Sequence, residues 1–93
     1  MKKVYSVYDK KGCFYSNPFI VDNAIQAVRS FQQAVMDKGT QISMYPDDFA
    51  LFYFGTFDED KGTFDLLAVP HHVHEAIEFV QVANVPAQEK QEK

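Results

Sequence analysis

The sequence predicts an α+β domain with the element order β-β-α-β-β-α. Two strand–turn–strand segments, at residues 3–16 and 49–69, flank one stretch with helical spacing at 23–38. The simplest architecture for this order is a four-stranded antiparallel sheet with the long helix on one face. With 93 residues the chain is long enough for one core, so we expect a single domain over 1–85 and a disordered tail over 86–93.

The first strand pair is predicted from "KKVYSVYD", the turn "DKKG" and the returning "CFYS". The strands are rich in Val and Tyr, which favour sheets. Asp opens the turn, and Gly12 can supply a left-handed backbone position near its end. Pro18 ends the hairpin because proline cannot donate a hydrogen bond to a ladder.

The long helix is predicted over 23–38. Its apolar residues recur with helical spacing and form one stripe to bury, namely Ala24, Ala27, Val28, Phe31, Ala34 and Val35. Asp22 or Asn23 can cap the beginning of the helix, and Gly39 is placed to cap its end.

The third strand, "FALFYFGTFD", is apolar on both faces, which a sheet with one solvated side would not require. One long helix covers one face, so the second needs the C-terminal helix, a second subunit or a ligand. A homodimer is the most economical of these, with interface candidates Phe52, Phe54, Phe49 and Tyr53. The fourth strand is "TFDLLAV", and a short helix is expected over "HHVHEAIEFVQVA" after Pro70.

Composition excludes several classes of protein. The single cysteine, Cys13, allows no internal disulfide, no apolar run approaches the length of a membrane span, and the N-terminus lacks the features of a signal peptide. These features predict a cytoplasmic protein with no membrane contact. Charge is uneven: residues 1–40 hold six basic and three acidic side chains, whereas residues 41–85 hold one basic and eight acidic. Such asymmetry fits a polyanion-facing half, a head-to-tail subunit contact or two solvated faces.

No catalytic or metal site is indicated. On a helix, His71 with Glu75 and His74 with Glu78 would be four apart, a zinc-compatible spacing, but no second ligand cluster accompanies them and His72. The turn "DEDKG" lacks the glycine and glutamate positions of a calcium loop. No base accompanies Cys13 and no phosphate loop is present, so we expect no enzyme, no cofactor and no metal.

The N-terminal half has features of a single-stranded DNA site, although the residues alone favour an ordinary hairpin with solvated lysines. Lysines flank aromatic strands there, and sheets hold single strands with cations on phosphates and rings on bases. The candidate residues are Lys2, Lys3, Lys10, Lys11 and Arg29 for phosphates, with Tyr5, Tyr8 and Tyr15 for stacking.

Five segments in order, "MKKVYSVYD", "NPF", "AIQAVRSFQQAV", "YPDDFALFYFGTFDEDKGTF" and "AIEFV", resemble the small nonstructural protein of gokushovirus-type microviruses. These viruses are bacteriophages with single-stranded DNA genomes, and the resemblance covers residues 1 to 81. It implies a nonstructural role in viral single-stranded DNA synthesis or packaging, in the cytoplasm of the infected bacterial host, by a family commonly described as DNA-binding. The alternative is an adaptor that binds a viral or host replication protein through the aromatic sheet face.

Overall fold

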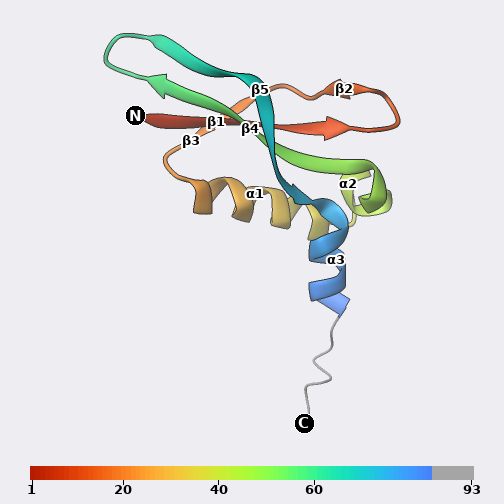
Figure 1. The fold of residues 1–93 in the computed structure, drawn as a ribbon. Coiled ribbons are helices and arrows are strands. Elements are labelled where there is room, and N and C mark those ends of the chain that lie inside the picture. The colour runs from red at the N-terminus through yellow and green to blue at the C-terminus, as the bar shows by residue number, and fades with distance from the viewer. Residues whose placement is uncertain (85–93) are drawn as a thin grey trace.

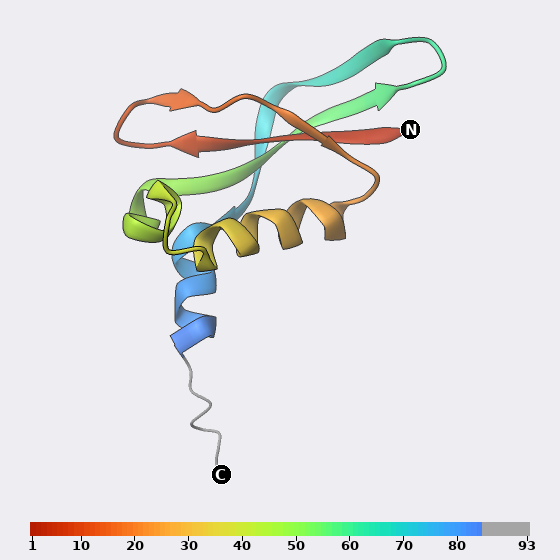
Figure 2. The same cartoon turned by 180° about the vertical axis from the view of Figure 1, so that it is seen from behind.

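The fold is a curled antiparallel sheet with helices against one of its faces (Figures 1 and 2). This computed structural model describes residues 1–84, with side chains for residues 1–80. The strands are β1 (Lys2–Asp9), β2 (Phe14–Tyr15), β3 (Phe19–Val21), β4 (Phe49–Asp58) and β5 (Thr63–Glu75). The helices are α1 (Ala24–Met36), α2 (Gln41–Met44), the 3-10 turn η1 (Pro46–Asp48) and α3 (Ala76–Asn84). The predicted α+β class and the antiparallel sheet are confirmed, while the predicted tail lies outside the described residues.

The sheet has the strand order β2-β1-β4-β5, and every pairing is antiparallel. Because β4 pairs with the whole of β1, β2 and β3 both lie on the other edge of β1. Sequence analysis missed β3, which is three residues long and begins directly after Pro18. Proline therefore interrupts the returning chain and divides it into two short strands.

The core lies between the sheet and α1. Ala27, Phe31 and Val35 are the buried residues of α1, and their spacing puts them on one stripe. They pack against side chains from β1 and β4, among them Tyr5 and Leu51. This stripe agrees with the predicted one except at Ala24, which is exposed, so helical periodicity alone identified the face that α1 buries.

The ends of α1 are set by side-chain hydrogen bonds. The Asn23 side chain accepts from the Gln26 N–H at 2.9 Å, which confirms a predicted cap. The predicted end at Gly39 is wrong: Asp37 is the C-cap, and Gly39 does not have the left-handed backbone of a C-terminal glycine. Thr40 instead donates its hydroxyl to the Ala34 carbonyl at 2.7 Å and accepts from the Ser43 N–H, joining α1 to α2.

The C-terminal helix begins five residues later than the sequence predicted. The segment from His71 to Glu75 continues β5 and pairs with β4, and α3 begins at Ala76. The Glu78 carboxylate accepts from the Glu75 N–H at 2.8 Å, which is the return half of a capping box. The expectation of a helix from His71 was therefore wrong, because the ladder with β4 and this cap fix the boundary at Glu75.

The first hairpin turn differs from the prediction in one residue. The Asp9 carboxylate accepts from two backbone N–H groups of the turn, as expected of Asp at that position. The left-handed residue is Cys13, with φ of 60°, and Gly12 is not left-handed. In the second turn the glycine does take this role, since Gly62 has φ of 69°.

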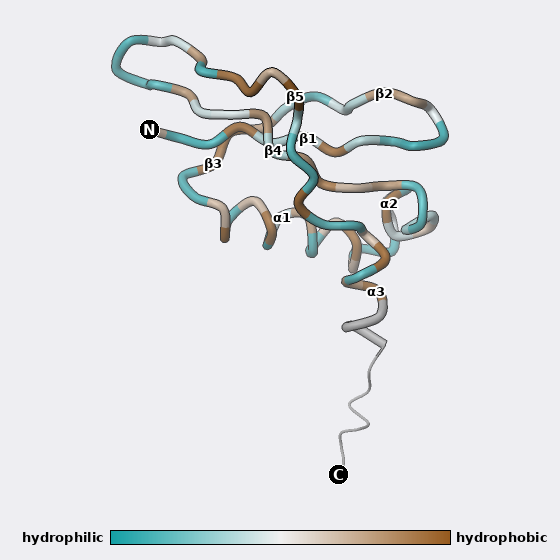
Figure 3. Tube along the Cα trace, in the orientation of Figure 1, coloured by the Kyte–Doolittle hydropathy of each residue, from teal (hydrophilic) through white to brown (hydrophobic). Residues whose placement is uncertain are grey.

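Gly55 marks the place where β4 bends. Its φ is +147°, and a bulge at Phe54 lies beside it, where β4 shifts register against β1. A Cβ on Gly55 would collide with the backbone of Asp65 and Leu66 in β5. Beyond this bend β4 and β5 continue as a hairpin away from the helices, and Figure 3 shows an apolar stretch of β5 there.

Replacing Gly55 with alanine should therefore destabilise the fold. We expect Gly55→Ala to lower the free energy of unfolding by about 1–3 kcal/mol, because a strained backbone and a steric clash act together. Urea denaturation measures this change. Gly62→Ala is the matched control, since Gly62 also has positive φ, but an added Cβ would meet no atom within 4 Å. Equal costs at the two positions would contradict the close-approach argument.

Candidate functional site

The sheet face opposite α1, called the open face from here on, is not covered by any helix of residues 1–84. Side chains alternate along the strands, so Tyr5 and Leu51 point to α1 whereas Tyr8 and Phe52 point to the open face. The C-terminal helix α3 contacts α1 and η1, on the side of the sheet that α1 occupies (Figures 1 and 2). The C-terminal helix therefore does not cover this face, which leaves a second subunit or a ligand of the three possibilities considered from the sequence.

Four aromatic rings form a connected cluster on the open face. This aromatic cluster consists of Tyr8, Tyr15, Phe52 and Phe54. Tyr15 is central, with ring centroids 4.7 Å from Tyr8, 5.5 Å from Phe52 and 5.3 Å from Phe54. Two of the three contacts are edge-to-face, the arrangement that the charge distribution of aromatic rings favours. Tyr15 is 38% exposed, so the cluster presents ring surface to solvent.

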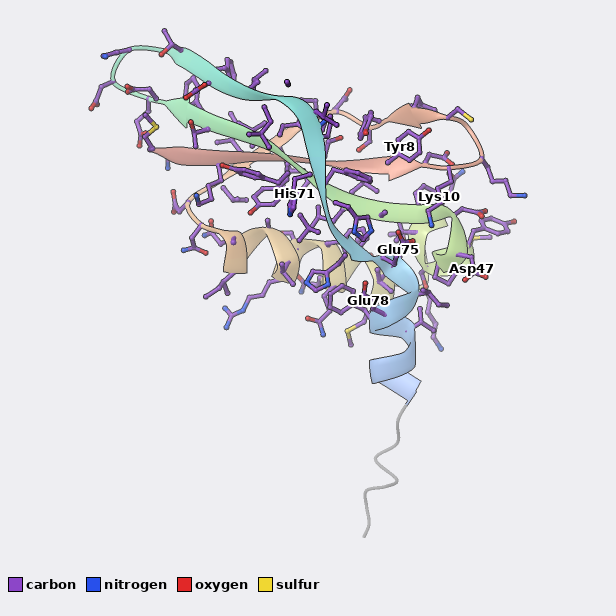
Figure 4. The ribbon with its side chains drawn as sticks, viewed as in Figure 1. Tyr8, Lys10, Asp47, His71, Glu75 and Glu78 are labelled. Atoms are coloured by element: carbon purple, nitrogen blue, oxygen red, sulfur yellow. The ribbon has the colours of Figure 1, made fainter. Side chains whose placement is uncertain are left out.

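A polar network borders the aromatic cluster. Lys10, in the β1–β2 turn, donates to the Glu75 carboxylate and to the Asp47 carbonyl (Figure 4). The other carboxylate oxygen of Glu75 lies 2.7 Å from Nε2 of His72. The His72 ring contacts Phe52 edge-on, with centroids 5.4 Å apart. The network therefore joins the basic turn to the aromatic cluster.

The pKa of Glu75 reflects this network. Partial burial alone would raise it, but hydrogen bonds from Lys10 and His72 outweigh burial and hold the pKa of Glu75 below its usual value. The pKa of Glu78 is also lowered, first by the Glu75 N–H and then by His74, whose Nδ1 lies 2.9 Å from the Glu78 carboxylate. Both carboxylates are therefore held in the charged form that a cation or an N–H donor prefers.

The predicted phosphate-binding side chains do not gather at one place. Lys2 and Lys3 lie at one end of β1, and Lys10 and Lys11 follow its other end, about 25 Å away for eight strand residues. Arg29 is exposed on α1, which lies on the opposite side of the sheet from the aromatic cluster. The sheet therefore separates Arg29 from the open face.

Most of these cations already have partners within the chain. Lys2 donates to Asp22 at 2.5 Å, and this pair raises the pKa of Lys2 and lowers the pKa of Asp22. The Lys3 ammonium lies 5.7 Å from the centre of the Tyr53 ring. In the part of the chain that the structure describes, no ion pair involves Lys11.

The predicted stacking and interface residues divide between the two faces. Tyr5 is only 3% exposed, and its burial raises its pKa, so its ring is not accessible to a base. Phe49 is a core residue and Tyr53 packs against the core, both on the face that α1 covers. Phe52 and Phe54 lie on the open face with Tyr8 and Tyr15. The three residues on the covered face were selected because the residue pattern does not indicate which strand face meets the helix.

The histidine segment forms no metal site within residues 1–84. The helical spacing considered for zinc does not exist, because His71 and Glu75 both lie in β5. Among the described residues no group of three side chains is placed to hold a metal ion. Sequence analysis missed the pairing of His72 with Glu75 and Lys10, and no local spacing signals it, since 65 residues separate Lys10 from Glu75. No helix in the described range is long and apolar enough to cross a membrane.

Stability should depend on pH through Glu75. Its pKa is lower in the folded than in the unfolded chain, so ionisation stabilises the fold above the unfolded value, about 4.3, and this contribution is lost as pH falls through the folded value. We expect Glu75→Gln to reduce the loss of unfolding free energy between about pH 5 and about pH 3. Urea denaturation at a series of pH values measures it.

Lys10→Met provides the companion variant for that experiment. It removes the main cationic partner of Glu75, so Glu75→Gln in this background should change the acid dependence less than it does in the native chain. An unchanged pH dependence in Glu75→Gln alone would contradict the network described above.

Comparison with known proteins identifies the family. A sequence model described as "Phage ORF5 protein" matches residues 2–79. The chain is 39% identical to "Protein ORF5" of Chlamydia phage 1 over a 64-residue alignment, with 64% of this chain and 67% of that protein covered. No solved structure matches. The match confirms the resemblance found in the sequence: this chain belongs to the Phage ORF5 protein family, small nonstructural proteins of gokushovirus-type microviruses.

Proposed function

We propose that this phage protein is a non-enzymatic binder of single-stranded DNA that acts in viral DNA synthesis or packaging, in the cytoplasm of the infected host. The observation that carries the proposal is the aromatic cluster on the open face, with the Lys10–Lys11 turn at its border. Exposed rings on a sheet, flanked by cations, are a common way of holding unpaired bases.

The rings would supply most of the binding free energy. On the open face Tyr15 is exposed and Phe54 beside it is half-buried, so their rings can contact unpaired bases. Stacking of a base on an aromatic side chain is worth about 1–3 kcal/mol, and it tolerates any base because every base has a π-face. The proposed binding is therefore weakly sequence-dependent.

Phosphate contacts would contribute less than the sequence suggested. Lys10 is paired with Glu75, so a phosphate must compete with a carboxylate for it, whereas Lys11 has no ion-pair partner among the described residues. If one or two cations contact phosphates of a single strand, the logarithm of the binding constant falls with the logarithm of the salt concentration, with a slope of about −0.7 to −1.4. A modest but measurable salt dependence follows.

Loss of one ring should weaken binding to single-stranded DNA. We expect Tyr15→Ala or Phe52→Ala to raise the dissociation constant by about 5- to 150-fold, the equivalent of one lost stack. Fluorescence anisotropy with a labelled oligothymidine at low and moderate salt measures this change. Tyr45→Ala is the matched aromatic control, because Tyr45 is 55% exposed and lies outside the sheet, between α2 and η1.

Charge-reversal variants distinguish DNA binding on the open face from DNA binding on the side of α1. Lys11→Glu should weaken DNA binding and flatten its salt dependence, while Arg29→Glu should leave the affinity within about twofold at moderate salt, where distant charges are screened. No binding at low salt, or equal effects of the two reversals, would refute binding on the open face.

A second candidate function is that of an adaptor that binds a viral or host replication protein through the open face. The internal pairing of Lys2 and Lys10 with carboxylates favours it, because paired lysines offer little charge to a polyanion while the rings suit a protein surface. Joint reversal of Lys10 and Lys11 to Glu distinguishes the two functions. It should weaken DNA binding under the first proposal and leave a captured replication protein bound under the second, whereas Tyr15→Ala weakens both.

A further inference from the structure

The hairpin that β4 and β5 form beyond Gly55 projects away from the helices (Figure 1). We call residues 55–69 the arm. Every residue from Thr63 to Val69 is exposed, and four of these are large apolar side chains: Phe64 at 55%, Leu66 at 54%, Leu67 at 46% and Val69 at 74%. Figure 3 shows this apolar stretch along β5. The arm thus holds the densest run of exposed apolar side chains in residues 1–80.

On one side the arm is held by β1, since Lys2–Val4 pair with Gly55–Phe57 of β4. The support on its other side is weaker. Within the arm, the rings of Phe57 and Phe64 pack together with centroids 4.8 Å apart. The outer edge of β5 pairs with no strand in the described part of the chain, so its backbone groups there can accept a further strand.

The sequence of this edge lacks the usual protection against strand pairing. Natural edge strands carry lysine or proline, or are very short. Between Thr63 and Val69 there is neither lysine nor proline, and Asp65 is the only charge. Lys61 and Pro70 flank the segment and limit pairing to about seven residues. Within it, Thr63–Leu66 are in register with β4, whereas Leu67–Val69 belong to a bulge of β5. The opposite edge of the sheet, in contrast, consists of the short strands β2 and β3.

The segment also matches itself in antiparallel orientation. A two-fold axis near Leu66 puts Phe64 beside Ala68 and Asp65 beside Leu67, so no like charges face each other. The same register brings Asp60 of each copy toward the partner's exposed His72, with Lys61 toward His71. Charge and apolar pattern therefore both fit a second copy of this chain.

We propose that two copies associate through the outer edges of their β5 strands, which pair antiparallel over Thr63–Val69. The sheet then continues across the two-fold axis, and the exposed apolar side chains of the two arms cover one another. The aromatic cluster of each copy lies on β1, β2 and β4, and of its members only Phe54 adjoins the arm, so a contact through the outer edge of β5 leaves Tyr8, Tyr15 and Phe52 free. The proposal is independent of what those clusters bind.

The test is the mass of the protein in solution without DNA. Light scattering after size exclusion should give a dimer for the native chain at micromolar concentration. Leu66→Lys with Val69→Lys introduces the charges that protect natural edges and should raise the dimer dissociation constant at least about tenfold. Ile25→Lys with Met44→Lys is the matched control, since both side chains are at least as exposed as Leu66 but lie outside the sheet. It should remain dimeric, and circular dichroism confirms that each variant is folded.

Disulfide trapping tests the register without relying on a destabilising change. With Cys13 replaced by Ser, Leu66→Cys should form a disulfide-linked dimer under mild oxidation, and Ile25→Cys should not. A monomer at every concentration would overturn the proposal. So would a dimer that survives the arm variants but dissociates in Phe52→Asp, since that result assigns the contact to the open face.

Discussion

The packing of one stripe of α1 against the inner pair of strands determines the rest of the structure. Phe31 and Val35 meet Tyr5 and Leu51 there, and burial of side chains of this size stabilises a fold by about 1.5–3 kcal/mol each. Ala76, fully buried at the start of α3, joins the same core. Because α3 docks at this core, both helices lie on one side of the sheet. No helix of residues 1–84 covers the aromatic face or the projecting hairpin arm, and these are the two surfaces considered for function.

On the open face, aromatic rings offer more to a ligand than positive charge does. Rings around Tyr15 can stack on bases or contact a protein, while Lys10 in the bordering network is paired with Glu75. A ligand held there gains more from stacking than from charge, which agrees with a chain of net charge −4. The arm is different, since in residues 1–84 the outer edge of its β5 strand pairs with no strand and its apolar side chains are exposed. The aromatic cluster lies on β1, β2 and β4, whereas this outer edge belongs to β5.

Sequence reasoning succeeded where a local pattern determines the outcome. The stripe of α1, the cap at Asn23 and the strand at 49–58 all follow from spacing and residue type. It failed where contacts between residues far apart in the sequence determine the structure. The segment from His71 to Glu75 is strand because β4 lies beside it, and Tyr5 is buried because α1 covers its face. The pairing of Lys10 with Glu75 joins residues 65 positions apart, which no local pattern indicates.

The most direct test of the central claim is a titration of isotope-labelled protein with a short single-stranded DNA, followed by amide chemical shifts. If the open face is the binding surface, the shifts concentrate at the β1–β2 turn and in β4 around Phe52, with little change along α1. Shifts centred on Arg29 and its neighbours in α1, or no shifts at low salt, would contradict the account.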